Sequence, residues 1–186
     1  MHGLPPLVFI SLIHYQFETI HPFPDGNGRV GRILIPLILR SRHVMEQPLL
    51  YLSQYYENNR DEYIDLMFDV SSKRKWEEWI YIFLKGVSES CENTIVTIHK
   101  VRELQDQYKE KCQQARSSAL LLSIIDEIFD KLYVTVPAIK NLTWTGYTAA
   151  KNNINKLIEH GILKELEYPG RMKFYVANGL MALFDR

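Results

Sequence analysis

The sequence predicts a mainly α-helical protein in two parts, with strands expected only in the C-terminal part. The first observation is the length of 186 residues, which suffices for one large domain or two small ones. The second is that apolar side chains recur at helical spacing through most of the chain before Ser117. The third is a change in the sequence pattern after Ser117, where short helical patterns are followed by two runs that are typical of strands. We expect domains over 1–100 and 117–186, joined by a helical linker over 101–116.

The composition is that of an ordinary soluble globular protein, with 46% hydrophobic and 24% charged residues. Because the formal net charge is zero, the chain as a whole is not expected to hold nucleic acid or an anionic membrane by its charge. No apolar stretch approaches the ~20 residues of a membrane span, and no basic, cleavable leader follows Met1. Cys91 and Cys112 would stand about 30 Å apart on one helix, too far for a disulfide. We therefore expect a cytoplasmic protein without membrane association.

Two helices are expected in the first 42 residues. Residues 4–20 have little polar face and should form a buried helix, with Pro5 and Pro6 tolerated in its first turn. A compact domain rarely begins with a helix that needs partners on most sides, so we expect earlier elements of the fold to be missing from this sequence. The second helix is expected over 29–42, where apolar residues form one stripe.

Two longer helical regions complete the first part. Ser53 is the expected N-cap of a helical region that runs to about Val70. Trp76 begins a long helical pattern that continues to about Gln114. The second half of this pattern, from Lys100, is strongly polar, and we expect it to be a solvated spacer between the domains.

The C-terminal part combines three short helices with a β-hairpin. Gly161 is a typical helix stop, and the sequence Tyr-Pro-Gly-Arg is typical of a turn between strands. The expected elements are helices over 120–132, 134–142 and 148–160, a turn at 144–146, and strands over 162–167 and 172–176 joined by 168–171. A helix, a helix–turn–helix and a hairpin in this order predict a winged helix.

The residues with the most chemistry lie between the first two helices, in the stretch His21-Pro22-Phe23-Pro24-Asp25-Gly26-Asn27-Gly28-Arg29-Val30-Gly31-Arg32. Two prolines exclude a helix before Asp25, and the apolar run after Arg32 favours a helix after Gly28. A glycine-rich loop that leads into a helix leaves backbone N–H groups free. Arg29 and Arg32, three residues apart on the first turn, add two cations on one side. The stretch therefore predicts an anion-binding site.

Generic glycine motifs fit this stretch less well. Gly26, Gly28 and Gly31 match a dinucleotide-binding fingerprint, but that motif follows a strand, and here a helix and two prolines precede it. The phosphate-loop motif fails because no Gly-Lys-Ser/Thr follows. A calcium loop that starts at Asp25 would need glutamate where Pro36 stands. The remaining alternative is a tight surface turn with solvated arginines.

The stretch from His21 to Arg32 resembles the signature of the Fic family, His-x-Phe-x-Asp-Gly-Asn-Gly-Arg-x-x-Arg, at every defined position. The resemblance continues through residues 16–20, 50–53 and 76–79, and more loosely into the winged-helix tail that many bacterial Fic proteins carry. It implies a Fic-type helical core followed by a C-terminal winged-helix domain, with the N-terminal part of the Fic fold missing. The family's target-docking flap, a β-hairpin before the motif helix, is expected to be absent too.

The resemblance implies a protein adenylyltransferase, which transfers AMP from ATP to a Ser, Thr or Tyr hydroxyl of a target protein and releases pyrophosphate. It assigns His21 as the general base and Asp25 as the ligand of a Mg²⁺ ion that bridges the ATP phosphates. Phe23 is expected to pack into the core and to pin the loop. Phosphate binding is assigned to Gly26, Asn27, Gly28, Arg29 and Arg32.

Three positions refine this implied function. Tyr63 matches an adenine-side tyrosine of the family, with core packing as the alternative. Glu92, within residues 88–93, fits the family's inhibitory pattern Ser/Thr-x-x-x-Glu-Gly/Asn and is a candidate autoinhibitory partner of Arg32; the alternative is a chance match in a polar helix. Doc-type kinases, a related branch, carry lysine where this chain has Gly28, bind ATP in a reversed orientation and transfer phosphate. Gly28 therefore favours AMP transfer.

A second hypothesis is a winged-helix regulator that binds DNA or another protein and has an inactive Fic core. The candidate phosphate contacts are few, namely Lys151, Lys156, Arg171 and Lys173. The intact motif favours the enzyme, whereas the target protein, a DNA contact and a homo-oligomeric state stay open. The other histidines considered lack metal-ligand spacing and are expected to be structural or exposed: His14, His43, His99 and His160.

Overall fold

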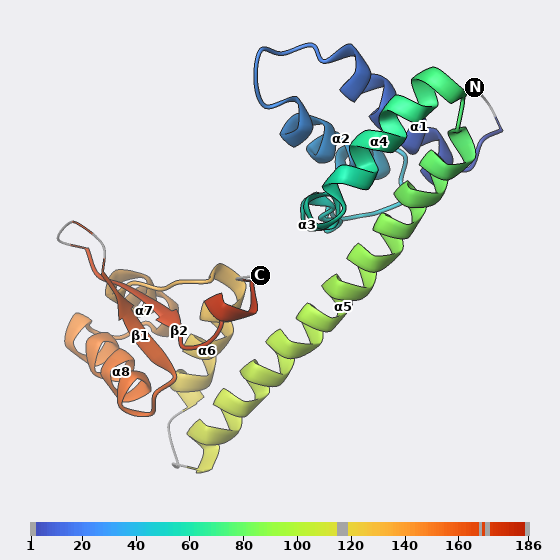
Figure 1. The fold of residues 1–186 in the computed structure, drawn as a ribbon. Coiled ribbons are helices and arrows are strands. Elements are labelled where there is room, and N and C mark those ends of the chain that lie inside the picture. Colours follow the sequence, from blue (N-terminus) through green and yellow to red (C-terminus); the bar gives the residue numbers. More distant parts are fainter. Residues whose placement is uncertain (1–2, 115–118, 168, 170–171, 185–186) are drawn as a thin grey trace. The chain divides into compact units, whose positions relative to one another are not determined.

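The computed structural model describes residues 3–114, 119–167, 169 and 172–184. It is mainly helical, as predicted, and divides into two compact units, Met1–Val96 and Thr97–Arg186 (Figure 1). The division falls inside the long helix α5, Trp76–Gln114. No helix in the described part of the chain is both long and apolar enough to span a membrane.

The first unit consists of the helices that were expected in the first part of the chain. Helix α1 begins at a proline, which lacks the N–H that a first turn leaves unpaired, and α2 follows after a six-residue loop over 21–26. Its helices are α1 Pro6–Ile20, α2 Asn27–Ser41, α3 Ser53–Asn58, α4 Arg60–Lys73 and the first part of α5. The predicted helices over 4–20 and 29–42 are confirmed, with ends shifted by one or two residues.

The helical region expected from Ser53 to about Val70 is two helices. Asn59 leaves the helical conformation, with φ −116°, and its side-chain amide donates to the carbonyl of Tyr55 at 2.8 Å. The expected N-cap role of Ser53 is wrong. Leu52 occupies the N-cap position, no side chain caps α3, and the Ser53 hydroxyl points to another element. This short-range competition between an asparagine amide and the helix backbone is the usual reason that Asn interrupts a helix.

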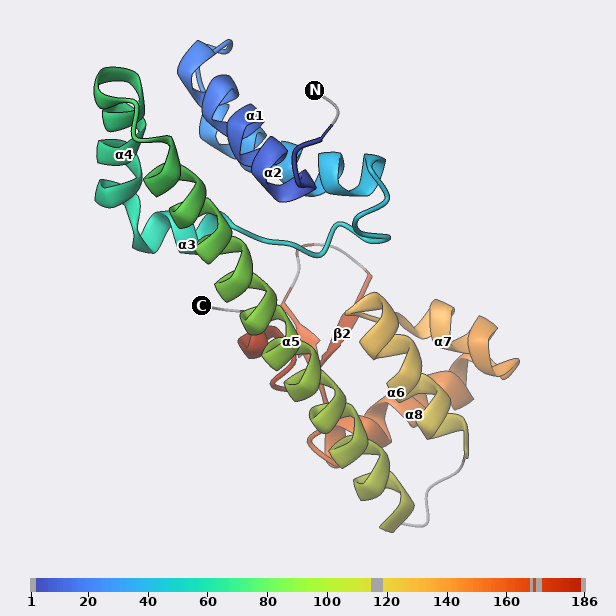
Figure 2. The ribbon, with the colours of Figure 1, turned by 90° about the vertical axis from the view of Figure 1, so that its right-hand side faces the viewer.

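The core of the first unit lies where α1, α2 and α5 meet. Trp79 and Phe83 of α5 are fully buried against Ile10 of α1 and Ile35 of α2. The indole N–H of Trp79 donates to the carbonyl of Ser11 at 3.0 Å, so the largest core side chain also ties α5 to α1. Helices α1 and α2 lie side by side (Figure 2). This packing fixes the two helices that flank the glycine-rich loop.

The second unit has the predicted order of elements. These are the second part of α5, α6 Ala119–Lys131, α7 Val136–Thr143, α8 Tyr147–Glu159, β1 Leu163–Leu166, β2 Phe174–Ala177 and a 3-10 turn over Met181–Leu183. The two strands pair antiparallel, with Leu163 opposite Ala177 and Leu166 opposite Phe174. Val134 adds a single bridge to Tyr175. Tyr168, Gly170 and Arg171 of the expected turn lie outside the described residues.

Residues 97–114 of α5 belong to the second unit. Cys112 is buried in its core, and Val101, Leu104 and Tyr108 pack against the same core. The predicted linker over 101–116 is thus helical as far as Gln114, with an apolar side that is covered by its own unit; residues 115–116 lie outside the described part. Cys91 and Cys112 are both free thiols on α5.

Candidate active site

His21 ends α1 and faces solvent at the start of the loop. Its backbone is left-handed, with φ 52°, and its N–H donates to the carbonyl of Phe17 at 3.0 Å. The ring Nδ1 lies 3.3 Å from the carbonyl oxygen of Glu18. Because a carbonyl only accepts, this contact assigns the proton to Nδ1 and leaves Nε2 as a free acceptor. The structure therefore presents His21 as an exposed imidazole whose neutral tautomer is set by the backbone of α1.

Asn27 holds the loop in shape. Its side-chain oxygen accepts from the N–H of Phe23 at 2.9 Å, and its amide donates to the carbonyl of Phe23 at 2.6 Å. The Asn27 residue is 2% exposed, so both ends of its amide are used inside the protein. A phosphate contact from Asn27 is left to its backbone N–H.

The expected burial of Phe23 is wrong. Phe23 is 47% exposed, and its ring contacts Phe17 at a centroid distance of 6.4 Å. The loop is held at this position through the backbone of Phe23, by Asn27, and not through its ring.

The N-terminus of α2 is the predicted anion-binding part of the site. Gly26 is the N-cap in a left-handed conformation, with φ 83°, which glycine adopts without strain. No side chain caps the helix, no acidic residue lies in its first turn, and Gly26 accepts its first helical hydrogen bond from Val30 at 3.0 Å. The N–H groups of Asn27, Gly28 and Arg29 lie before that bond and have no partner within the helix. Together with the helix dipole they favour an anion here.

Arg32 lies across the first turn of α2. Its Nε donates to the Ser53 hydroxyl at 3.1 Å. A β-carbon placed on Gly28 would lie 3.1 Å from Nη1 of Arg32, so the guanidinium occupies the space that Gly28 leaves open. The absence of a side chain at Gly28 thus leaves room for the guanidinium of Arg32.

Arg29 and Asp25 form an exposed pair at the edge of the site. Nη2 of Arg29 lies 3.4 Å from Oδ2 of Asp25, and the two side chains are 73% and 92% exposed. Ion pairs of this exposure contribute little to stability, so either partner can exchange the other for a ligand at low cost. Within the described residues no group of three or more metal-ligating side chains is present.

A buried polar cluster lies beneath the motif on the α1 side: His14, Glu18 and Tyr63. Nε2 of His14 lies 3.1 Å from the hydroxyl of Tyr63, and its Nδ1 lies 4.0 Å from Oε1 of Glu18. Burial and the charge of Arg32 lower the pKa of His14 to about 4, against a smaller raising effect of a backbone hydrogen bond to Gly31. Burial raises the pKa of Glu18, and the positive charge of Arg32 opposes this effect.

Tyr63 lies on the core side of this cluster. Burial raises the pKa of its hydroxyl, and its ring packs near Tyr56 at 4.7 Å and Trp79 at 5.5 Å between centroids. Its predicted adenine contact stays a prediction. Glu92 is exposed on α5, and no ion pair joins it to Arg32 within residues 3–114, so its autoinhibitory role also stays a prediction.

Sequence reasoning missed three residues of this region. The Ser53 hydroxyl accepts a hydrogen bond from Arg32. The Glu18 carboxyl lies against Gly31, in the space that a β-carbon there would fill, and His14 is buried next to that carboxyl. A histidine and a glutamate four residues apart in an otherwise apolar helix were a usable signal, because they share one face of α1. The contact of Ser53 with Arg32 had no local signal.

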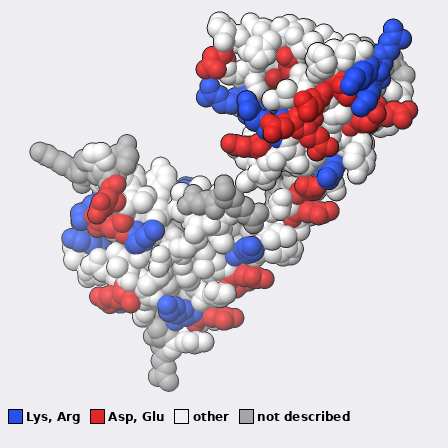
Figure 3. All heavy atoms as spheres, viewed as in Figure 1, with Lys and Arg blue, Asp and Glu red and all other residues white. Residues whose placement is uncertain are grey.

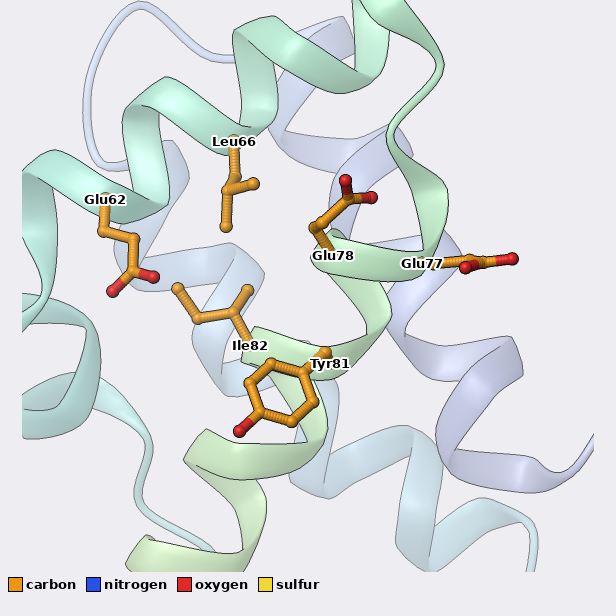
Figure 4. Close-up of a pocket in the computed structure, with 6 residues that line it drawn as sticks. All are labelled: Glu62, Leu66, Glu77, Glu78, Tyr81 and Ile82. Carbon is orange, nitrogen blue, oxygen red and sulfur yellow. The ribbon is translucent and has the colours of Figure 1, made fainter.

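A pocket in the same unit has a different character. It has a volume of about 500 Å³ between α4 and α5 and is lined by Glu62, Leu66, Glu77, Glu78, Tyr81 and Ile82 (Figure 4). Acidic side chains gather on this face of the first unit (Figure 3). Because carboxylates repel phosphates, this pocket is unsuited to a nucleotide, and none of its residues belongs to the loop.

The buried imidazole makes the first unit sensitive to acid. The unfolded chain binds a proton at His14 near its ordinary pKa of 6.5, whereas the folded chain resists it until about pH 4. The contribution of His14 to the free energy of unfolding is therefore fully present above pH 6.5. It decreases by about 3 kcal/mol as the pH falls toward 4. Glu18 acts oppositely, because its raised pKa lets the folded state take up a proton first and offsets part of the loss.

Urea unfolding between pH 7 and 4 tests this expectation, with Trp76 and Trp79 as reporters in a Trp144→Phe background. His14→Gln should flatten the decline of the midpoint with pH, whereas His99→Gln, at an exposed position, should retain it. An equal decline in both variants would assign the acid sensitivity to other groups.

The fold and the site define a helical protein with an exposed imidazole close to a helix N-terminus that no side chain caps. The Fic/DOC family model matches residues 1–39. The chain is 42% identical over 77 residues to the "Probable protein adenylyltransferase aq_aa38" of Aquifex aeolicus (strain VF5), which covers 41% of this chain and 20% of that protein. The "Protein adenylyltransferase Fic" of Nematostella vectensis is 53% identical over 36 residues, 19% of this chain and 8% of the relative. That of Drosophila mojavensis is 40% identical over 57 residues, 30% and 11% respectively.

Residues 1–39 of the chain match part of the Fic domain, and the chain is similar over part of its length to proteins that are named protein adenylyltransferases. The matches span a fifth or less of the length of these relatives.

Proposed function

We propose that the chain is a protein adenylyltransferase that transfers AMP from ATP to a Ser, Thr or Tyr hydroxyl of a target protein. The observation that carries the proposal is the free Nε2 of His21 in the same short loop that ends at the anion-binding start of α2. A base and a phosphate site are the two parts that such a transfer needs. The names of the relatives, all adenylyltransferases, support the same reaction and ATP as the substrate.

Each group has a defined task in this reaction. Nε2 of His21 takes the proton of the target hydroxyl while its oxygen attacks the α-phosphorus of ATP. The bond from the α-phosphorus to the bridging oxygen of pyrophosphate breaks, and the electron pair leaves with pyrophosphate. Arg29, Arg32 and the N–H groups at the start of α2 stabilise the charge that develops on this leaving group.

The residues present fit a magnesium ion. Mg²⁺ is usually held by one or two carboxylates together with substrate phosphates, and Asp25 offers one exposed carboxylate before the phosphate site. When bound, the ion would neutralise charge on the phosphates. Asp25 would hold it and would release Arg29 to the phosphates.

The position of Arg32 supports AMP transfer over phosphate transfer. The β-carbon of a side chain at residue 28 would lie 3.1 Å from Nη1 of Arg32, so a lysine there would require this guanidinium to shift. With Gly28 the cation lies over the helix N-terminus, where a departing pyrophosphate would be bound. We assign Tyr63 to the adenine side and Glu92 to autoinhibition as parts of the same proposal.

We also propose that the second unit is a winged helix. The support is the order of its elements, the packing of α7 against α8, the pairing of β1 with β2 and the Val134–Tyr175 bridge that adds a third strand position. The proposal also includes a cytoplasmic location without membrane association. It includes a target protein, whose identity stays open, and a homo-oligomeric state.

Two labels on ATP test the reaction. Incubation of the chain with Mg²⁺ and [α-³²P]ATP should label protein, whereas [γ-³²P]ATP should not. Arg32→Ala should lower the labelling strongly, and Arg40→Ala, in the last turn of the same helix, should not. Label from the γ-phosphate would indicate a kinase. ATP binding without label would favour the alternative, a winged-helix regulator with an inactive Fic core.

Ser53→Ala should weaken ATP binding through Arg32. Loss of the hydroxyl leaves Nε of Arg32 without its acceptor, and the freed guanidinium should raise the KM for ATP about 3–10-fold, since one such hydrogen bond contributes about 1 kcal/mol. Ser53→Thr keeps the hydroxyl and is the matched control. Equal KM values in the alanine and threonine variants would show that Ser53 does not position Arg32.

A further inference from the structure

The pocket between α4 and α5 is lined by carboxylates that the first unit does not neutralise. Residues 57–92 contain nine acidic and five basic side chains, so this surface is negative although the whole chain is neutral. The lysines of this segment are paired within the fold: Lys73 and Lys75 with Asp69, at 2.8 and 2.9 Å, and Lys85 with Glu89, at 3.9 Å. No ion pair within the described part of the chain involves the carboxylates that line the pocket: Glu62, Glu77 and Glu78.

Apolar side chains separate these carboxylates. Leu66 of α4 and Ile82 of α5 point toward one another, with Glu62 on one side of them and Glu78 on the other (Figure 4). The side chain of Glu77 points away from this pair (Figure 4). Because the carboxylates do not converge on one point, they favour an elongated organic cation over a metal ion. The pocket volume of about 500 Å³ is sufficient for such a group.

The ring of Tyr81 lies beside these side chains and suits a guanidinium. Tyr81 is 69% exposed, and its ring lies next to Ile82 (Figure 4). A cation over an aromatic ring is attracted to it, and the planar guanidinium of arginine also stacks on such rings. The methylene groups of an arginine can pack on apolar surface such as that of Leu66 and Ile82 while the charge stays near a carboxylate. The pocket therefore matches the stem, the plane and the charge of an arginine side chain.

A buried hydroxyl near the pocket lacks a partner. Tyr55 of α3 is 5% exposed, and its hydroxyl makes no hydrogen bond within the described part of the chain. Its ring lies against α5, since a β-carbon on Gly86 would lie 2.5 Å from it. Burial raises the pKa of this hydroxyl to about 12, with smaller contributions from Glu89, Glu62 and Tyr81. Two of these three groups line the pocket, so the hydroxyl lies at their end of it. A buried polar group normally has a hydrogen-bond partner, and a ligand N–H would supply one here.

We propose that this pocket binds an arginine side chain in a basic segment of a partner protein. The guanidinium donates to Glu62 and to the Tyr55 hydroxyl and stacks on Tyr81. A second cation of the segment contacts Glu78. A protein segment is favoured over a small free cation because the negative charge extends beyond the pocket over 57–92, where further basic residues of a segment would lie (Figure 3). This binding does not depend on nucleotide transfer, because no lining residue belongs to the glycine-rich loop.

Fluorescence anisotropy with the full chain and a dye-labelled peptide that contains two arginines tests the charge contacts. The peptide should bind at low salt about 10-fold more tightly, or better, than the same peptide with citrulline, the neutral isostere of arginine. Glu62→Gln/Glu78→Gln should weaken the binding of the arginine peptide to a similar extent. Glu103→Gln/Glu110→Gln removes the same charge from exposed positions of α5 outside the pocket, and it should change the affinity by less than about 2-fold.

The same titrations can contradict the proposal. Equal affinities of the arginine and citrulline peptides, or equal losses in the two double variants, would overturn the site. Spermidine that displaces the labelled peptide at a lower concentration than the unlabelled peptide does would assign the pocket to a small free cation, and it would overturn the protein partner.

The two tyrosines test the placement of the guanidinium. Tyr81→Leu should weaken peptide binding about 3-fold, whereas Tyr81→Phe keeps the ring and should bind as the wild type does. Tyr55→Phe should weaken binding about 3–10-fold and leave the urea midpoint unchanged, because it removes a hydroxyl that has no partner in the described part of the chain. A lower midpoint with unchanged affinity would show that this hydroxyl serves the fold, and it would overturn its place in the site.

Discussion

Replacing His21 by alanine is expected to lower the rate of AMP transfer by about 10²–10⁴-fold and to leave the fold and ATP binding almost unchanged. The rate falls because the target hydroxyl loses the base that accepts its proton, a contribution of this size in general base catalysis. The fold persists because the imidazole is exposed and its only described hydrogen bond is to the carbonyl of Glu18. The proposed phosphate site, at the start of α2 with the two arginines, does not include the ring.

Single-turnover labelling with [α-³²P]ATP measures the rate, and titration calorimetry measures ATP affinity. The variant should regain rate as the pH rises, because hydroxide replaces the missing base. His99→Ala, at an exposed position on α5, is the matched control and should behave as the wild type. An unchanged rate in the His21 variant would remove His21 from the mechanism, whereas a loss of ATP binding would assign it to the phosphate site.

Replacing Gly31 by alanine is expected to destabilise the first unit by about 1–3 kcal/mol and to impair the site above it. A β-carbon at this position would lie 2.1 Å from Oε1 of Glu18 and 3.1 Å from the ring of Phe17. The side chain of Glu18 is only 8% exposed, and its Oε1 lies 4.0 Å from Nδ1 of His14, so a shift of the carboxyl away from the new β-carbon would change this contact. Alanine normally favours a helix over glycine by up to about 1 kcal/mol, so a net loss identifies the contact as its cause.

A double-mutant cycle with Glu18→Ala isolates this contact. If the overlap with the carboxyl dominates, Gly31→Ala should cost little in the Glu18→Ala background, with a coupling free energy of about 1 kcal/mol or more. Urea unfolding monitored by Trp76 and Trp79 supplies the stabilities. Additive losses would show that the Phe17 ring, and not the Glu18 carboxyl, limits the approach of α1 to α2.

The amino-acid sequence determined the parts of the site that depend on local sterics and periodicity. Prolines at 22 and 24 exclude a helix, the glycines permit the left-handed turn at residue 26, and an apolar stripe from residue 30 predicts α2. These features place His21, Asp25 and Arg29 around one helix N-terminus. The family resemblance then followed from the same residues, and the comparisons confirmed it. The order of elements in the second unit was predictable for the same reason.

Only the tertiary structure decided how side chains distant in sequence share the site. Ser53 accepts from Arg32 across 21 residues, and Trp79 binds the backbone of α1 across 68. The side-chain amide of Asn27 binds the backbone N–H and carbonyl of Phe23, and the Phe23 ring is exposed. Such contacts depend on which faces of α1, α2, α3 and α5 pack together. Helical periodicity in each segment reports that a face is buried, but the partner of that face is set by close packing between segments.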